Sequence, residues 1–154
     1  MREPLAFRLR PKTLDDILGQ KILVGENGVI RKCINNDTMF SSIFFGPPGT
    51  GKTTLARVIA NELKKPYRNF NAVTGNKKDL YAIFLEAKMS GQIILICDEV
   101  HRLNKDKQDL LLPHVENGSI ILIGATTANP YHSINPAIRS RCHLFEFKPL
   151  EHED

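Results

Sequence analysis

The run GPPGTGKT, residues 46–53, restricts the possible folds of this chain more than any other feature of the sequence. It follows a short apolar segment, 43–45, and leads into a stretch with helical spacing, 53–63. Its three glycines let the backbone turn tightly and bring N–H groups against an anion, and the start of the helix adds a favourable dipole. A plain Gly/Pro turn is the alternative, but a turn does not require Lys followed by Thr at this offset. The run therefore predicts a phosphate-binding loop between a strand and a helix.

Nine consecutive residues are expected to surround the phosphates of ATP: Gly46, Pro47, Pro48, Gly49, Thr50, Gly51, Lys52, Thr53 and Thr54. Within this set, Lys52 would reach the β- and γ-phosphates as a point charge. The Thr53 hydroxyl would coordinate Mg²⁺. The loop thus predicts ATP and Mg²⁺ as the bound cofactors.

The order of the remaining segments predicts the fold class. Apolar runs bounded by turn residues recur at 67–71, 93–97, 120–124 and 144–147, and helical spacing recurs at 77–89, at 104–115 and after 135–136. Strands that alternate with helices favour right-handed crossovers and a parallel sheet covered on both faces. At 154 residues the chain is about one domain long. We therefore expect a three-layer αβα P-loop NTPase fold with a five-stranded parallel sheet.

Two adjacent carboxylates, Asp98 and Glu99, follow the buried strand predicted at 93–97. A core would not accept them unpaired, so they must emerge at the edge of the sheet, where ligands of such folds bind. Asp98 then suits a role in the magnesium shell, and Glu99 suits the base that orients and polarises the attacking water. The alternative is a helix-capping Asp beside a solvated Glu.

Polar residues also follow the last two predicted strands. The segment 125–130 places hydroxyls and an amide where one of them could touch the γ-phosphate or its water, although Thr, Asn and Pro are also ordinary turn residues. Before the last strand, an arginine of the run 139–142 could neutralise charge in the transition state, or could be a plain surface residue.

Composition excludes several other classes of protein. The three cysteines are odd in number and widely spaced, which fits neither a disulfide framework nor a CxxC metal site. Apolar stretches are far shorter than a membrane span needs, and the first residues lack the apolar run of a signal peptide, so a cytoplasmic protein without a membrane partner is expected. The net charge of +4 would suit a nucleic-acid partner but does not establish one.

Taken together, these residues resemble the AAA+ ATPases of the clamp-loader clade, and within it the RarA/MgsA-type replication-associated recombination ATPases. The match runs from about residue 4 to about residue 149. It is carried by the segments RPKTLDDILGQ (10–20), NAVT (71–74), DEVHRLNK (98–105), LPHVENG (112–118) and GATTANP (124–130). RuvB-type branch-migration motors share a similar acidic box and GATT run, and clamp-loader subunits share the start and the run Ser140-Arg141-Cys142, so both remain alternatives.

The resemblance implies further roles. Arg10, Pro11 and Ile17 would line the adenine pocket, Thr127 would be sensor 1, and Arg141 would be an arginine finger acting on the ATP of a neighbouring subunit. Asn129 is the second choice for the sensor. Relatives act as homo-oligomers in DNA replication, recombination and repair at stalled forks, with single-strand or fork DNA and single-strand-binding protein as partners. A nucleoid-associated location would follow for a bacterial protein.

The same resemblance suggests how the chain is organised. Residues 1–150 would form the AAA+ nucleotide-binding core, with 1–20 as the adenine-pocket segment and 151–154 as a polar tail. The family continues into a helical lid and an oligomerisation domain, which are expected to be missing from this chain. The isolated chain should therefore bind nucleotide weakly and hydrolyse it slowly or not at all. A non-catalytic AAA+ scaffold and a DNA-binding domain with an incidental ATP site are the alternatives.

Overall fold

The computed structural model describes residues 28–149, and within that part of the chain strands and helices alternate. The strands are β1 (Ser42–Phe45), β2 (Tyr67–Asn71), β3 (Ile93–Asp98), β4 (Ile120–Thr126) and β5 (His143–Glu146). The longer helices are α3 (Val29–Asn35), α4 (Lys52–Leu63), α5 (Lys77–Ser90) and α6 (Lys105–Glu116). Three short helical segments complete the order: η2 (Val100–Arg102), α7 (Pro130–Ser133) and α8 (Pro136–Arg139).

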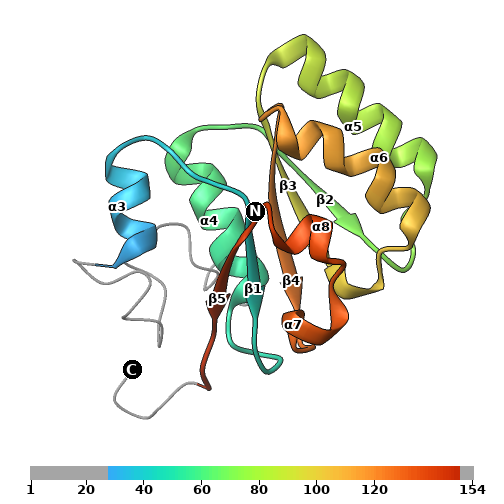
Figure 1. Cartoon of the computed structure of the whole chain (residues 1–154). Coiled ribbons are helices and arrows are strands. Elements are labelled where there is room, and N and C mark those ends of the chain that lie inside the picture. The colour runs from blue at the N-terminus through green and yellow to red at the C-terminus, as the bar shows by residue number, and fades with distance from the viewer. Residues whose placement is uncertain (1–27, 150–154) are drawn as a thin grey trace, which may run out of the picture.

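The five strands form one parallel sheet in the order β2-β3-β4-β1-β5, as Figure 1 shows. After β1 the chain crosses to the far edge at β2, returns through β3 to β4 beside β1, and then passes over β1 to β5. The carboxyl ends of β1, β3 and β4 therefore lie next to one another, although up to 81 residues separate them in sequence. In open α/β sheets this is where ligands bind.

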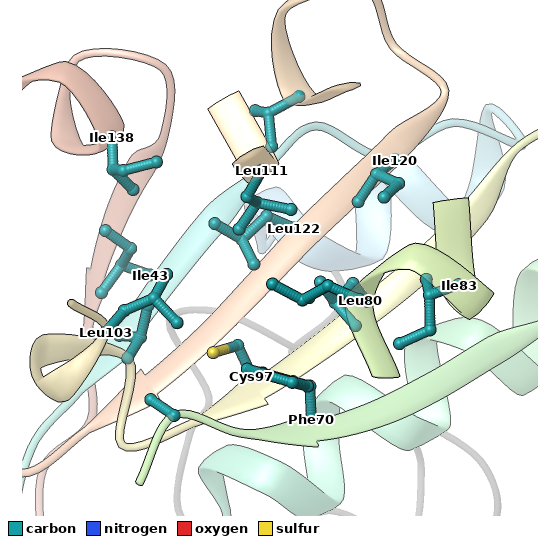
Figure 2. Packing of buried hydrophobic residues seen from close by; sticks show 14 of the residues in the cluster. Ile43, Phe70, Leu80, Ile83, Cys97, Leu103, Leu111, Ile120, Leu122 and Ile138 are labelled. Atoms are coloured by element: carbon teal, nitrogen blue, oxygen red, sulfur yellow. The ribbon is translucent and has the colours of Figure 1, made fainter. Parts of the chain in front are cut away.

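Alternate residues of the central strands supply two cores, one on each face of the sheet. In β3, Ile94 and Ile96 pack with α3 and α4, whereas Ile93, Leu95 and Cys97 pack with α5 and α6. Figure 1 shows these two pairs of helices on opposite sides of the sheet, and Figure 2 shows the second core, with Leu80, Leu111 and Leu122 among its members. Because both faces of the strand are buried, its sequence is apolar without interruption. The predicted three-layer α/β fold is confirmed.

Helix α5 lies where the helical spacing at 77–89 predicts it, and one of its faces is buried. Leu80, Ile83 and Ala87 are buried, and Lys77 and Lys78 are exposed on the other side. The Asn76 side chain accepts a hydrogen bond from the Asp79 N–H, and the Asp79 carboxylate accepts one from the Asn76 N–H, which forms a capping box.

Several boundaries differ from those expected. Strand β4 extends to Thr126, two residues past the predicted end, because its last residues still pair with β1 and β3. Strand β5 covers 143–146 instead of 144–147. Helix α3, the turn η2 and the short α7 were not predicted, since segments of three to seven residues carry too little periodicity. Within residues 28–149, no helix is long and apolar enough to cross a membrane.

Candidate active site

The phosphate-loop residues 46–53 connect β1 to α4 and begin against the end of β4. Gly46 donates its N–H to the carbonyl of Thr126 at 3.2 Å, and Phe45 pairs with Thr126 in register. Gly46 has φ of 149°, and a Cβ built there would lie 2.2 Å from the carbonyl oxygen of Phe147. Only glycine fits at this position, because a side chain would collide with rigid backbone. Gly49 and Gly51 also have positive φ, as the predicted tight bend requires.

Lys52, the first residue of α4, is almost buried under the loop. Its Nζ donates to the carbonyl oxygens of Gly46 and Pro47, each at 2.7 Å. Burial lowers the pKa of the Lys52 ammonium, and the nearby Glu99 carboxylate opposes that shift. The loop thus holds one cation at its centre, where the phosphates of a nucleotide would lie.

Thr53 and Asp98 meet although 45 residues separate them in sequence. The Thr53 hydroxyl donates to Asp98 Oδ1 at 2.9 Å, and both residues are half-buried. Asp98 is the last residue of β3, beside Asn71 on β2 and Ala125 on β4. A hydroxyl and a carboxylate at this spacing present hard oxygen donors, which are the ligands that Mg²⁺ prefers.

Glu99 adopts a left-handed backbone conformation, with φ of 57° and ψ of 41°. Such a conformation is uncommon for a non-glycine residue and is often found at functional sites. It turns the chain sharply out of β3 into η2, so the Glu99 side chain faces the cavity instead of the core. The side chain is 45% exposed and is therefore free to meet a ligand.

These side chains line one cavity of about 320 Å³ at the carboxyl end of the sheet. Its residues are Lys52, Thr53, Asn71, Asp98, Glu99, Ala125, Thr126 and Thr127. Five of the predicted site residues thus come together from three separate segments of the chain: Lys52, Thr53, Asp98, Glu99 and Thr127. A second hollow, lined by Pro47, Pro48 and Asn129 among others, shares Thr127 with the first.

The two candidate sensor residues differ in their contacts. Thr127 is exposed and lines both hollows. Asn129 caps α7 by accepting a hydrogen bond from the Tyr131 N–H at 2.9 Å, so its side chain already has a structural partner. Thr126, just before Thr127, is 2% exposed and belongs to β4.

The two arginines after α7 also differ. Arg139 is half-buried and donates to the carbonyl oxygen of Tyr131 at 2.9 Å, which makes it a structural residue of the α7–α8 segment. Arg141 is 52% exposed and forms an ion pair with Glu116 at 3.1 Å. It does not line the cavity that contains Lys52 and Glu99, so it does not contact the phosphate site of its own chain.

Three other predicted residues, Arg10, Pro11 and Ile17, lie outside the described residues, as do the segment 1–20 and the tail 151–154. Conversely, sequence reasoning missed two polar residues around the site, Asn71 and His101, and it included Thr126 only among the hydroxyls of 125–130. Asn71 stands at the carboxyl end of its strand, which is the signal that could have identified it. Nothing in the local sequence shows that His101 and Thr126 touch.

The cysteines have no part in this site. All three thiols are free; Cys33 and Cys97 are buried, and Cys142 is partly buried. Burial raises the pKa of Cys97 and of Cys142 to about 12. Both thiols therefore stay protonated and unreactive at neutral pH.

Comparison with known proteins gives consistent results. Residues 42–150 match the model of the ATPase family associated with various cellular activities, AAA. Replication-associated recombination protein A of Bacillus subtilis is 57% identical over 98% of this chain and 36% of its own length. The protein of the same name from Escherichia coli K12 is 41% identical over 99% of this chain and 35% of its own. The chain thus spans about a third of the length of these relatives.

The RuvB Holliday junction branch migration motor of Thermotoga maritima has a similar structure. Its TM-score is 0.75 at 29% identity, over 92% of this chain and 48% of that one. By its sequence match over 42–150 and by its fold, the chain belongs to the AAA family of ATPases.

Proposed function

We propose that this chain is the ATP-binding and ATP-hydrolysing core of an oligomeric AAA+ ATPase that acts on DNA in replication-associated recombination and repair. The observation that supports the chemistry best is the meeting of the phosphate loop with Asp98 and Glu99 around one cavity. The recombination proteins that match at 57% and 41% identity support the biological process. A branch-migration motor is less favoured, because its similarity is 29%.

Magnesium dependence is part of this proposal. Thr53 Oγ1 and Asp98 Oδ1 would hold Mg²⁺, directly or through its waters, and the ion would neutralise charge on the β- and γ-phosphates. Within residues 28–149 no group of three or more His, Cys, Asp or Glu side chains could bind a metal by itself. That suits Mg²⁺, which keeps several waters and takes one or two protein ligands together with the phosphates.

In the proposed reaction, Glu99 accepts a proton from a water whose oxygen attacks the γ-phosphorus. The bond between that phosphorus and the bridging oxygen breaks, and ADP leaves with the bonding electrons. Lys52 exchanges its bonds to the loop carbonyls for phosphate oxygens and stabilises the developing charge. Thr127 would hold the γ-phosphate or the water, and Asn129 remains the second choice.

Further residues are proposed to complete the site, some from outside residues 28–149 and one from a second subunit. Arg10, Pro11 and Ile17 would contact adenine, and the exposed Arg141 would act as a finger in the neighbour's site, where it would stabilise transition-state charge. Single-strand or fork DNA and single-strand-binding protein are the proposed partners of the oligomer. A single copy lacks the neighbour's finger, so the isolated 154-residue chain should turn over ATP slowly or not at all.

The test compares ATP turnover and nucleotide affinity for the wild type, Lys52→Ala and Glu99→Gln. Nucleotide affinity is measured on the 154-residue chain, and turnover is measured on the full-length protein, where the natural protein extends further, with single-strand DNA present. Lys52→Ala should lose both binding and turnover, whereas Glu99→Gln should lose about 100-fold in turnover and keep binding. Asp109→Asn, on the exposed side of α6, is the control and should change neither. Equal turnover in wild type and Glu99→Gln would contradict the proposed base.

A further inference from the structure

A chain of polar contacts joins the proposed base to the end of β4. His101 Nδ1 lies 2.7 Å from Thr126 Oγ1, and His101 Nε2 lies 3.6 Å from Glu99 Oε2. Thr126 Oγ1 also accepts the N–H of Ala128 at 2.9 Å. The imidazole of His101 therefore lies between Glu99 and the loop that carries Thr127.

One placement of the hydrogens satisfies every group in this chain of contacts. Thr126 Oγ1 accepts from Ala128 with one of its two lone pairs, and its own hydrogen can be donated to His101 Nδ1. A neutral imidazole that accepts at Nδ1 carries its proton on Nε2, and that N–H faces the Glu99 carboxylate. The distance of 3.6 Å exceeds a hydrogen bond, so a small rotation of the exposed Glu99 side chain would complete it.

The turn that carries His101 is itself seated on β4. Gly124 and Thr126 are two residues apart on one strand and so point to the same face. Val100 packs on Gly124, where a Cβ would lie only 2.9 Å from Val100 Cγ1, and His101 contacts Thr126. The His101 side chain is 20% exposed, against 45% for Glu99, so the imidazole is the more firmly held of the two.

We propose that His101 is a positioning residue for ATP hydrolysis: Thr126 orients its imidazole, and its Nε2–H holds the Glu99 carboxylate in the orientation that activates water. This inference rests on the proposed role of Glu99 as the base. It further links Glu99 to the loop bearing Thr127, because Ala128 and His101 share the Thr126 hydroxyl. A shift of that loop when the γ-phosphate leaves would therefore alter the contact between His101 and the Glu99 carboxylate.

Three substitutions separate the two contacts of the ring. A Gln amide reaches the position of His101 Nε2 and can still donate to Glu99. An Asn amide reaches only the position of Nδ1 and keeps the Thr126 contact. Phe keeps a ring but forms neither hydrogen bond. We expect His101→Phe and His101→Asn to lower kcat about 10-fold with unchanged nucleotide affinity, and His101→Gln to stay within about threefold of wild type. In a Glu99→Gln background, His101→Phe should have no further effect.

A merely structural role for His101 predicts different results. If Glu99→Gln still lowers turnover about 100-fold, the proposal is overturned by equal losses in all three variants or by kcat within twofold of wild type in all three. If Glu99→Gln itself does not change turnover, the proposed role of Glu99 is rejected. A second measurement then tests the contact between His101 and Thr126 independently of turnover. Nitrogen-15 NMR of the chain should show a His101 imidazole protonated at Nε2, with the tautomer populations changed by Thr126→Val. A His101 ring protonated at Nδ1, or tautomer populations unchanged by Thr126→Val, would refute the proposed orientation of His101 by Thr126.

Discussion

Substituting Gly124 by alanine should destabilise the protein by forcing Val100, and with it η2, away from β4. The added Cβ would meet Cγ1 of Val100 at 2.9 Å and its Cβ and Cγ2 at 3.0 Å. Carbon atoms in contact ordinarily lie about 3.5–4.0 Å apart, so Val100 must retreat by roughly 0.5–1 Å. Val100 is 3% exposed, so any movement must take place within the packed core.

The size of the effect follows from two opposing contributions. Overpacking a core in this way costs about 1–3 kcal/mol in the free energy of unfolding. Replacing Gly by Ala in ordinary extended backbone recovers about 0.4–1 kcal/mol, because the unfolded chain loses freedom. The middle of the two ranges gives a net loss of about 1.3 kcal/mol, between limits of about 0 and 2.6 kcal/mol.

A double-mutant cycle tests the cause. Val100→Ala alone removes two buried methyl groups and should cost about 1.5 kcal/mol or more. In the double variant Gly124→Ala/Val100→Ala the new methyl occupies part of the vacated space, so the combined loss should fall below the sum by about 1 kcal/mol. Urea unfolding of the 154-residue chain measures all four free energies. Additive losses would refute the reasoning, and so would a Gly124→Ala variant more stable than wild type.

The remaining predictions concern charge, thiols and the shared site. Burial lowers the pKa of Lys52 in the folded state, so the unfolded state binds more protons between that lowered pKa and the unfolded value near 10.5. The free energy of unfolding of the wild type, relative to Lys52→Met, should therefore rise with pH in this window. Urea unfolding between pH 7 and 10 measures the rise. Cys97 and Cys142 each have a pKa raised to about 12, so both thiols should resist a thiol reagent at pH 8 in the native protein. Both should react fully in denaturant. A fast reaction of Cys97 in the native protein would contradict its burial. Mixed oligomers of Lys52→Ala and Arg141→Ala subunits should regain part of the ATP turnover that each variant lacks alone. In these oligomers the Lys52→Ala subunit supplies the arginine finger and the Arg141→Ala subunit supplies the phosphate loop. A mixture as inactive as its components would argue against a shared site.

Much of the site could be predicted from local sequence because its chemistry is concentrated in short segments. The loop 46–53 and the pair Asp98-Glu99 each join a strand to a helical turn, so their place at the carboxyl end of the sheet follows once the strands are recognised. The uninterrupted apolar runs of β3 and β4 likewise predict a sheet buried on both faces. The AAA family match over 42–150 agrees with that interpretation.

The contacts between segments were decided only by the tertiary structure, because they depend on strand register and on side-chain packing across elements. Parallel pairing sets Asn71 beside Asp98 at the mouth of the cavity, and no local pattern encodes which strands become neighbours. The same pairing turns Thr126 inward to His101 and leaves Thr127 exposed, a difference that local composition does not show although the family resemblance singles out Thr127. The fold also separates the two arginines: it brings carbonyl oxygens to the half-buried Arg139 and the Glu116 carboxylate to the exposed Arg141.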